Sequence, residues 1–137
     1  MNPDKNYSRR YFFTMAIVLG GIAIVFFRCK YDKEDIQPQL PAVVSFSQHI
    51  LPIFNSTCSL SGCHSGGSPT GNLDLTSAHA YTQLFARHEV DTLNPTLSVL
   101  YIQINSTGST QMPPTGKMSA YNINLILKWI QQKAKNN

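Results

Sequence analysis

Apolar residues recur at steps of three and four in several stretches of the chain, which is the spacing of one buried face of an α-helix. The first stretch predicts a helix from Ser45 to Phe54, with Pro52 expected to kink or shorten it. A second helix is predicted from Ser77, as its N-cap, through Phe85, and a short third helix should begin near Ser98. No strand pattern or internal repeat competes with this helical interpretation.

The strongest helical pattern lies near the end of the chain. Ser119 is expected to cap a helix from Ala120 to Ala134, because its hydroxyl can accept a hydrogen bond from the first turn. The apolar residues of this helix share one face, with Trp129 beside it; they are Ile123, Ile126, Leu127 and Ile130. Residues 56–73 and 105–116 are rich in Gly, Ser, Thr or Pro and predict loops. The sequence therefore predicts an all-α domain of roughly three to five short helices.

The first part of the chain has a different character. Arg9 and Arg10 precede an uncharged, largely apolar run over residues 11–27, which is typical of an export signal or a membrane anchor. The positive flank is expected to stay in the cytoplasm, so that the rest of the chain faces outward. Residues 30–42, with two prolines and alternating charges, predict an extended linker. The predicted organisation is a signal or anchor over residues 1–29, this linker, and a domain over residues 43–135.

Charge is distributed unevenly along the chain. The formal net charge of +4 comes entirely from the first thirty residues, because residues 31–137 hold six basic and six acidic side chains. The domain therefore lacks the basic stripe of a nucleic-acid-binding protein, and we exclude nucleic acid as a partner.

The most informative motif is Cys58-Ser-Leu-Ser-Gly-Cys63-His64. Two thiols followed directly by an imidazole predict a covalent haem attachment site, in which the cysteines bond the vinyl groups and His64 binds the iron. Four residues separate the cysteines here, where the usual motif has two. The extra residues can bulge outward, because Ser59, Ser61 and Gly62 suit a bulged loop. The motif requires a histidine directly after the second cysteine, and His64 directly follows Cys63.

A second axial ligand is predicted in the polar loop near the end of the chain. Met112 is followed by Pro113 and Pro114, which restrict the loop backbone and would hold the thioether at the iron. The 47 residues between His64 and Met112 are enough chain to pass around the edge of a haem. Alternative sixth ligands are Met118, which lacks a following proline, and a histidine such as His79 or His88.

These motifs together resemble the monohaem class I cytochrome c domains of bacterial envelope proteins. The similarity covers roughly residues 43–134, and the spacing of four residues resembles the attachment sites of Bacteroidetes-type lipoproteins. The segments that carry it are His49-Ile-Leu-Pro-Ile-Phe54, Gly62-Cys-His64, Leu73-Asp-Leu75, Ser98-Val-Leu-Tyr101, Met112-Pro-Pro114 and Leu125-Ile-Leu-Lys-Trp-Ile130. The resemblance implies one haem c, and a first and a last helix that cross with Phe54 against Trp129 or Ile130.

The complete ligand set and the absence of a catalytic constellation predict a carrier of single electrons, not an enzyme, that exchanges them with redox partner proteins of the bacterial cell envelope. The domain would face the periplasm or the exterior and be tethered to a membrane. Cys29, which ends the apolar run, resembles the lipidated cysteine of a mature bacterial lipoprotein, and an uncleaved transmembrane anchor is the alternative.

Other interpretations of the cysteine motif remain open at this stage. Cys58 and Cys63 could form a disulfide in an exported, haem-free binding lipoprotein. They could also bind zinc with His64 and a fourth ligand, although no second pair of ligands matches them. If Met112 left the iron open, the protein would be a haem-based sensor or enzyme for a gas or peroxide. No combination of nucleophile, base and orienting group points to another catalytic activity.

Overall fold

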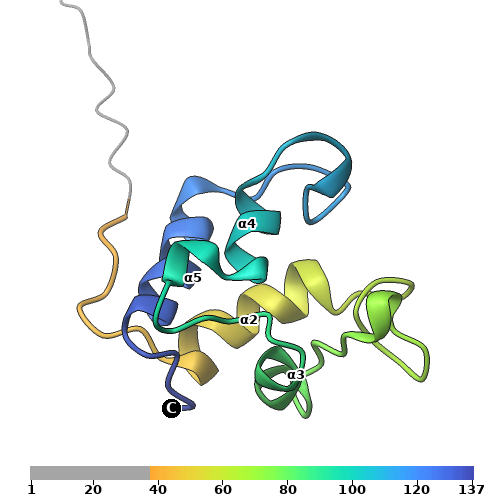
Figure 1. Ribbon diagram of the computed structural model, residues 1–137, viewed down its shortest axis with the longest axis horizontal. Helices are drawn as coiled ribbons and strands as arrows, with labels where there is room; N and C mark the ends of the chain where they lie inside the picture. Colours follow the sequence, from red (N-terminus) through yellow and green to blue (C-terminus); the bar gives the residue numbers. More distant parts are fainter. Residues whose placement is uncertain (1–37) are drawn as a thin grey trace, which may run out of the picture. The chain divides into compact units, whose positions relative to one another are not determined.

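The computed structural model describes residues 38–137, so the predicted signal or anchor and Cys29 lie outside the described residues. Its α-helices are α2 (Leu51–Ile53), α3 (Ala80–Ala86), α4 (Val99–Asn105) and α5 (Ala120–Gln131) (Figure 1). This part of the chain contains no strand, which confirms the all-α prediction. None of the helices over residues 38–137 is both long and apolar enough to cross a membrane.

The first helical segment changes its hydrogen-bonding pattern along its length. It comprises η1 (Phe46–Ile50), α2 and η2 (Phe54–Cys58), where η1 and η2 are wide π-helical turns. Pro52 has no N–H to donate to the carbonyl of Gln48, its partner in an ordinary α-helix, and the N–H of Leu51 instead reaches back to Phe46. Pro52 therefore widens the preceding turn, and the helical segment continues through it.

This segment ends at Cys58, four residues beyond the predicted end at Phe54, so the prediction of a loop from residue 56 was wrong. The hydroxyl of Ser56 donates to the carbonyl of Ile53 at 3.2 Å, and Thr57 donates to the same oxygen. The hydroxyl of Ser59 donates to the carbonyl of Phe54 at 3.2 Å. The hydroxyl side chains that suggested a loop thus donate hydrogen bonds to backbone carbonyls near the end of a helix.

The second predicted helix starts later than its sequence indicated. α3 begins at Ala80 with His79 at the N-cap, whereas Ser77 lies in the preceding turn and donates its hydroxyl to Asn55 at 3.1 Å. The prediction of Ser77 as the N-cap was therefore wrong: the N–H groups of His79 and Ala80 both donate to the carbonyl of Thr76, which opens the turn before α3. The prediction of a helix near Ser98 is confirmed, since α4 follows Ser98 directly. Short 3₁₀ turns lie at η3 (Thr70–Asn72), η4 (Pro95–Leu97) and η5 (Gly108–Thr110).

The closing helix begins as predicted and ends earlier. The Ser119 hydroxyl accepts a hydrogen bond from the N–H of Asn122 at 3.2 Å, which confirms the cap. α5 ends at Gln131, and not at Ala134, because Lys133 adopts a left-handed φ of 71° and the N–H of Ala134 bonds back to Trp129. Its buried residues are Ile123, Leu125, Ile126, Trp129 and Ile130, so that Leu125 is buried where the pattern had suggested Leu127.

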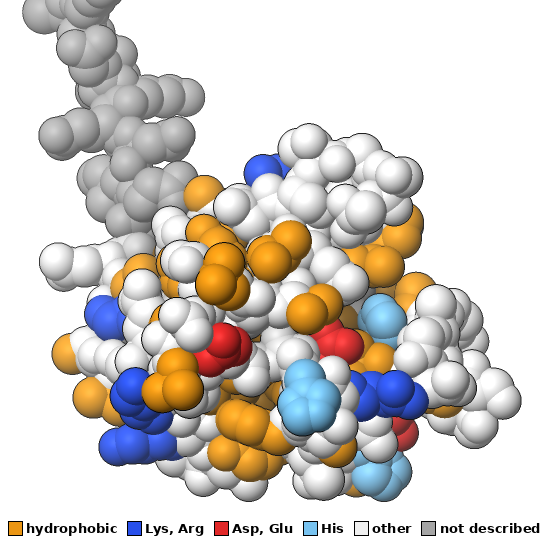
Figure 2. All heavy atoms as spheres, viewed as in Figure 1, with side chains coloured by type: hydrophobic (Ala, Val, Ile, Leu, Met, Phe, Trp, Pro, Cys, Tyr) orange, Lys and Arg blue, Asp and Glu red, His pale blue; other side chains and the backbone are white. Residues whose placement is uncertain are grey.

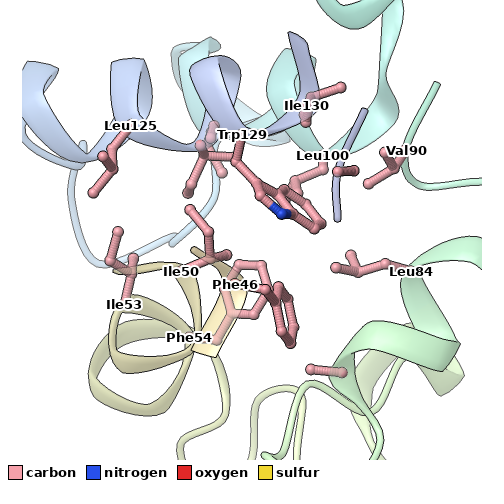
Figure 3. Packing of buried hydrophobic residues seen from close by; sticks show 14 of the residues in the cluster. Phe46, Ile50, Ile53, Phe54, Leu84, Val90, Leu100, Leu125, Trp129 and Ile130 are labelled. Atoms are coloured by element: carbon pink, nitrogen blue, oxygen red, sulfur yellow. The ribbon is translucent and has the colours of Figure 1, made fainter. Parts of the chain in front are cut away.

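The core lies where the first and last helical segments of residues 38–137 meet. Trp129 is 0% exposed, and Figure 3 shows its ring pointing from α5 toward Phe46 of η1. The ring centroids of Phe46 and Trp129 lie 5.3 Å apart, and those of Phe46 and Phe54 lie 6.3 Å apart. The first and last helical segments therefore pack together, and the rings that pair with Trp129 are those of Phe46 and Tyr81, where the resemblance had suggested Phe54.

Hydrogen bonds also join residues 42–47 to the C-terminal residues beside this core. The carbonyl of Asn137 accepts a hydrogen bond from the N–H of Ser47 at 2.8 Å. The side chain of Gln132 accepts from the N–H of Val44 at 2.9 Å and donates to the carbonyl of Ala42 at 2.7 Å. These contacts fix the position of α5, and the core that it completes supports α4 and the loop after it.

Candidate functional site

A cleft lies between the segment that carries the two cysteines and the segment around Met112. It encloses about 690 Å³ of empty space, counting the open solvent at its mouth. Its walls include all four residues predicted to hold a haem: Cys58, Cys63, His64 and Met112. Figure 2 shows hydrophobic, acidic and histidine side chains meeting on the face between the loops of residues 59–73 and 105–116.

Backbone hydrogen bonds determine how the cysteine motif is folded. The N–H of Cys63 donates to the carbonyl of Leu60 at 2.9 Å, and the N–H of His64 donates to the carbonyl of Cys58 at 3.1 Å. Gly62 permits the turn between them because its φ of 79° lies in the left-handed region that favours glycine. The bond from His64 to Cys58 closes the longer motif into a compact loop, so that both cysteines line the same cleft.

The His64 side chain is oriented by a second hydrogen bond. Its Nδ1 lies 3.1 Å from the backbone carbonyl of Thr70, and since a carbonyl only accepts, Nδ1 must carry the proton. The other ring nitrogen, Nε2, then holds the lone pair that binds a metal. The carbonyl of His64 also accepts a hydrogen bond from Leu75 at 2.8 Å, which fixes the backbone behind the ring. The imidazole is thus held in the tautomer that an iron ligand requires.

Met112 is held by the end of α4. Its N–H donates to the carbonyl of Gln103 at 3.0 Å, and the Gln111 side chain donates to the carbonyl of Pro113 at 3.2 Å. The Met112 side chain is half-buried and packs against the core, while Pro113 and Pro114 line the cleft beside it. Both sides of the cleft are therefore anchored on helical segments of the same core.

The alternative sixth ligands lie elsewhere. Met118 is 8% exposed and belongs to the hydrophobic core. His79 is exposed, and its Nδ1 lies 2.8 Å from the carboxylate of Asp74. His88 is exposed at the end of α3. None of the three lines the cleft that His64 and Met112 share.

The two cysteines are free thiols in this structure. Burial raises the pKa of the Cys58 thiol above its usual value, and nearby Cys63 raises it further, whereas a hydrogen bond with Thr57 opposes them. The neutral thiol is therefore favoured at Cys58. Over residues 38–137 no group of three or more His, Cys, Asp or Glu side chains is arranged to hold a metal ion.

The cleft is completed by residues that the sequence motifs did not indicate. Leu73, Leu75, Leu100 and Ile104 supply an apolar wall, and Gln103 and Glu89 supply polar groups. The spacing of Leu100 and Ile104 indicated a helical face, but not that this face borders a cleft. Glu89 carried no sequence signal, because its position depends on how the chain turns after α3.

We expect Glu89 to make the stability of the fold depend on pH. Burial raises the pKa of its carboxyl, an effect that His64 and Arg87 oppose. The folded protein thus holds this proton more tightly than the unfolded chain, and Glu89 lowers the free energy of unfolding as pH rises from the ordinary glutamate pKa through the raised one. Denaturant unfolding should show Glu89→Gln gaining stability over the original protein at neutral pH, with a smaller difference in acid.

Asp91 offers a matched control with the opposite sign. Hydrogen bonds from Asn94 and Leu93 lower the pKa of the Asp91 carboxyl, so its contribution to stability is present at neutral pH and is lost as pH falls through the lowered value. Asp91→Asn should therefore lose stability at neutral pH.

A Glu89→Gln protein whose free energy of unfolding shows no pH-dependent gain would contradict the burial assigned to Glu89.

Comparisons of this chain with protein-family models, with curated proteins and with solved structures found no match.

Proposed function

We propose that this protein is a c-type cytochrome that carries single electrons through one covalently attached haem. The observation that carries the proposal is the convergence of Cys58, Cys63, His64 and Met112 on one cleft, although Met112 lies far along the chain from the others. A haem c needs two thiols, a histidine next to the second thiol, and a second ligand opposite it.

The chemistry of the cleft fits that group. Leu73, Leu75, Leu100 and Ile104 provide the apolar surroundings that a porphyrin ring requires. The hydrogen bond from His64 Nδ1 to Thr70 leaves Nε2 free for iron. Bound haem would supply the one-electron chemistry, and the chain would supply the ligands, the apolar wall and the access of partners.

The proposal extends to the setting in which the protein works. The apolar run over residues 11–27 and Cys29 would tether the domain to a membrane of the bacterial envelope, through a spanning segment or through lipid. Because the charges of residues 31–137 balance, docking with redox partners would depend little on long-range attraction. The tether would instead raise the local concentration of the domain near partners in the same membrane.

Redox titration of protein matured with its haem tests the proposal. We expect a reversible one-electron couple and the weak long-wavelength band that reports methionine bound to ferric iron. Met112→Leu should abolish that band and lower the midpoint potential, because a thioether stabilises ferrous iron. Met118→Leu is the matched control: it changes a core methionine outside the cleft and should leave both unchanged.

Several outcomes would contradict this assignment. If the band is lost in Met118→Leu and kept in Met112→Leu, the iron ligand is Met118 and not Met112. An original protein that lacks the band and rapidly binds added carbon monoxide or nitric oxide would have an open iron site and act as a sensor. A protein that carries no haem after expression with an active maturation system would refute the proposal.

A further inference from the structure

Glu89 is the only Asp, Glu, Lys or Arg among the residues that line the described cleft. The other lining residues are apolar, polar and uncharged, or part of the predicted haem-holding set. Placing a carboxylate in such surroundings costs free energy, because the charge loses hydration, unless a partner compensates it. Its position therefore calls for a functional account.

The fold places Glu89 through a defined turn at the end of α3. The N–H of His88 donates to the carbonyl of Phe85 at 3.1 Å, and the N–H of Glu89 donates to the carbonyl of Leu84 at 2.9 Å. This pair of bonds is a Schellman motif, and it requires the left-handed φ of 58° that His88 adopts. The chain accepts a strained conformation at a residue that is not glycine, and the turn directs Glu89 to the cleft.

The backbone of Glu89 is also fixed on its other side. Its carbonyl accepts a hydrogen bond from the N–H of Leu100 at 3.0 Å, at the start of α4. Leu100 itself lines the cleft, and the neighbouring Val90 is buried in the core. Glu89 is therefore held between α3 and α4 and is not part of a free surface loop.

The negative charge of Glu89 is not cancelled by an ion pair in the described part of the chain. The charged or titratable groups that act on it are His64, from the cysteine motif, and Arg87 from its own segment. The cleft residues of α4 and of the Met112 segment carry no charge. With the two thiols bonded to haem and His64 bound to iron, Glu89 would be the remaining ionisable side chain of the cleft.

We infer that the Glu89 carboxylate is an electrostatic positioning group that lowers the redox potential of the bound haem; this inference rests on the proposed function. In the step concerned, ferric haem takes one electron from a reduced partner protein and becomes ferrous, and the partner is oxidised by one electron. The haem loses one positive charge, and no bond is formed or broken. A fixed negative charge stabilises the ferric state more than the ferrous state, most strongly where water is largely excluded.

Midpoint potentials of the haem-containing protein and of Glu89→Gln test this inference. The glutamine keeps the size of the side chain and removes its charge, so the potential should shift upward at neutral pH. The difference between the two proteins should shrink in acid, where Glu89 is itself neutral. A purely structural role for Glu89 would not produce this pH profile.

Asp91→Asn is again the matched control, because it removes one negative charge two residues away but outside the cleft. It should leave the potential close to that of the original protein. Equal potentials for the original protein and Glu89→Gln, or equal upward shifts for both variants, would overturn the inference while the haem assignment stands. Absence of haem from all three proteins would overturn the proposed function, and the inference with it.

Discussion

Replacing both Cys58 and Cys63 with alanine should abolish covalent haem attachment. Under the proposed function each cysteine would supply one thioether bond, and both line the cleft in which the ring would sit. After denaturing electrophoresis, the original protein should give a band that stains for haem peroxidase activity, and the double variant should give none. Each single variant should stain less than the original protein, because one of the two bonds remains.

Cys29→Ala is the control for this experiment. Cys29 lies in the N-terminal segment, outside the described residues, and is the candidate for lipidation. Its replacement should leave the haem stain intact while it changes how the protein partitions with membranes. Mass spectrometry of the original protein that finds Cys58 and Cys63 joined to each other would favour the disulfide interpretation and refute the haem assignment.

Replacing Trp129 with alanine should cause the largest loss of stability. The ring is fully buried against Phe46, and its Nε1 donates a hydrogen bond to the carbonyl of Lys135 at 3.0 Å. The truncation would leave a cavity between the first and last helical segments and an unpaired carbonyl beside it. A buried tryptophan replaced by alanine typically costs about 3–5 kcal/mol, which is a large part of the stability of a small domain.

Two further variants make this prediction specific. Trp129→Phe keeps much of the apolar volume and should lose less stability, even if Trp129→Ala fails to fold. Leu127→Ala, on the half-exposed side of α5, should have the smallest effect. Free energies of unfolding from denaturant titration would measure all three, and a loss in Leu127→Ala equal to that in Trp129→Phe would contradict the packing described here.

The shared cleft explains why a small domain could hold a large cofactor. Cys58 ends the first helical segment, and α4 holds Met112 through the carbonyl of Gln103. Both segments belong to the core that Trp129 completes. We therefore expect damage to the core to disturb haem binding, even though Trp129 does not line the cleft.

Sequence periodicity identified the helices well and their ends poorly. The Ser119 cap was predictable because a cap is a local interaction, between a hydroxyl and an N–H three residues later. Ser77 was misassigned because it lies inside a turn that the carbonyl of Thr76 opens, and α3 begins only after this turn, at Ala80. The first helical segment was predicted too short, because the hydroxyls of Ser56, Thr57 and Ser59 bond helix carbonyls where their composition had suggested a loop.

The sequence by itself determined the all-α class and named four candidate haem residues, because helical spacing and the Cys63-His64 step are local properties of the chain. Only the tertiary structure decided that Met112, and not Met118, His79 or His88, shares a cleft with His64. Tertiary structure alone also brought Glu89 into that cleft. These placements depend on contacts between different segments of the chain. The Schellman turn after α3 is hydrogen-bonded to α4, and α4 is hydrogen-bonded to Met112. No local sequence pattern encodes these contacts.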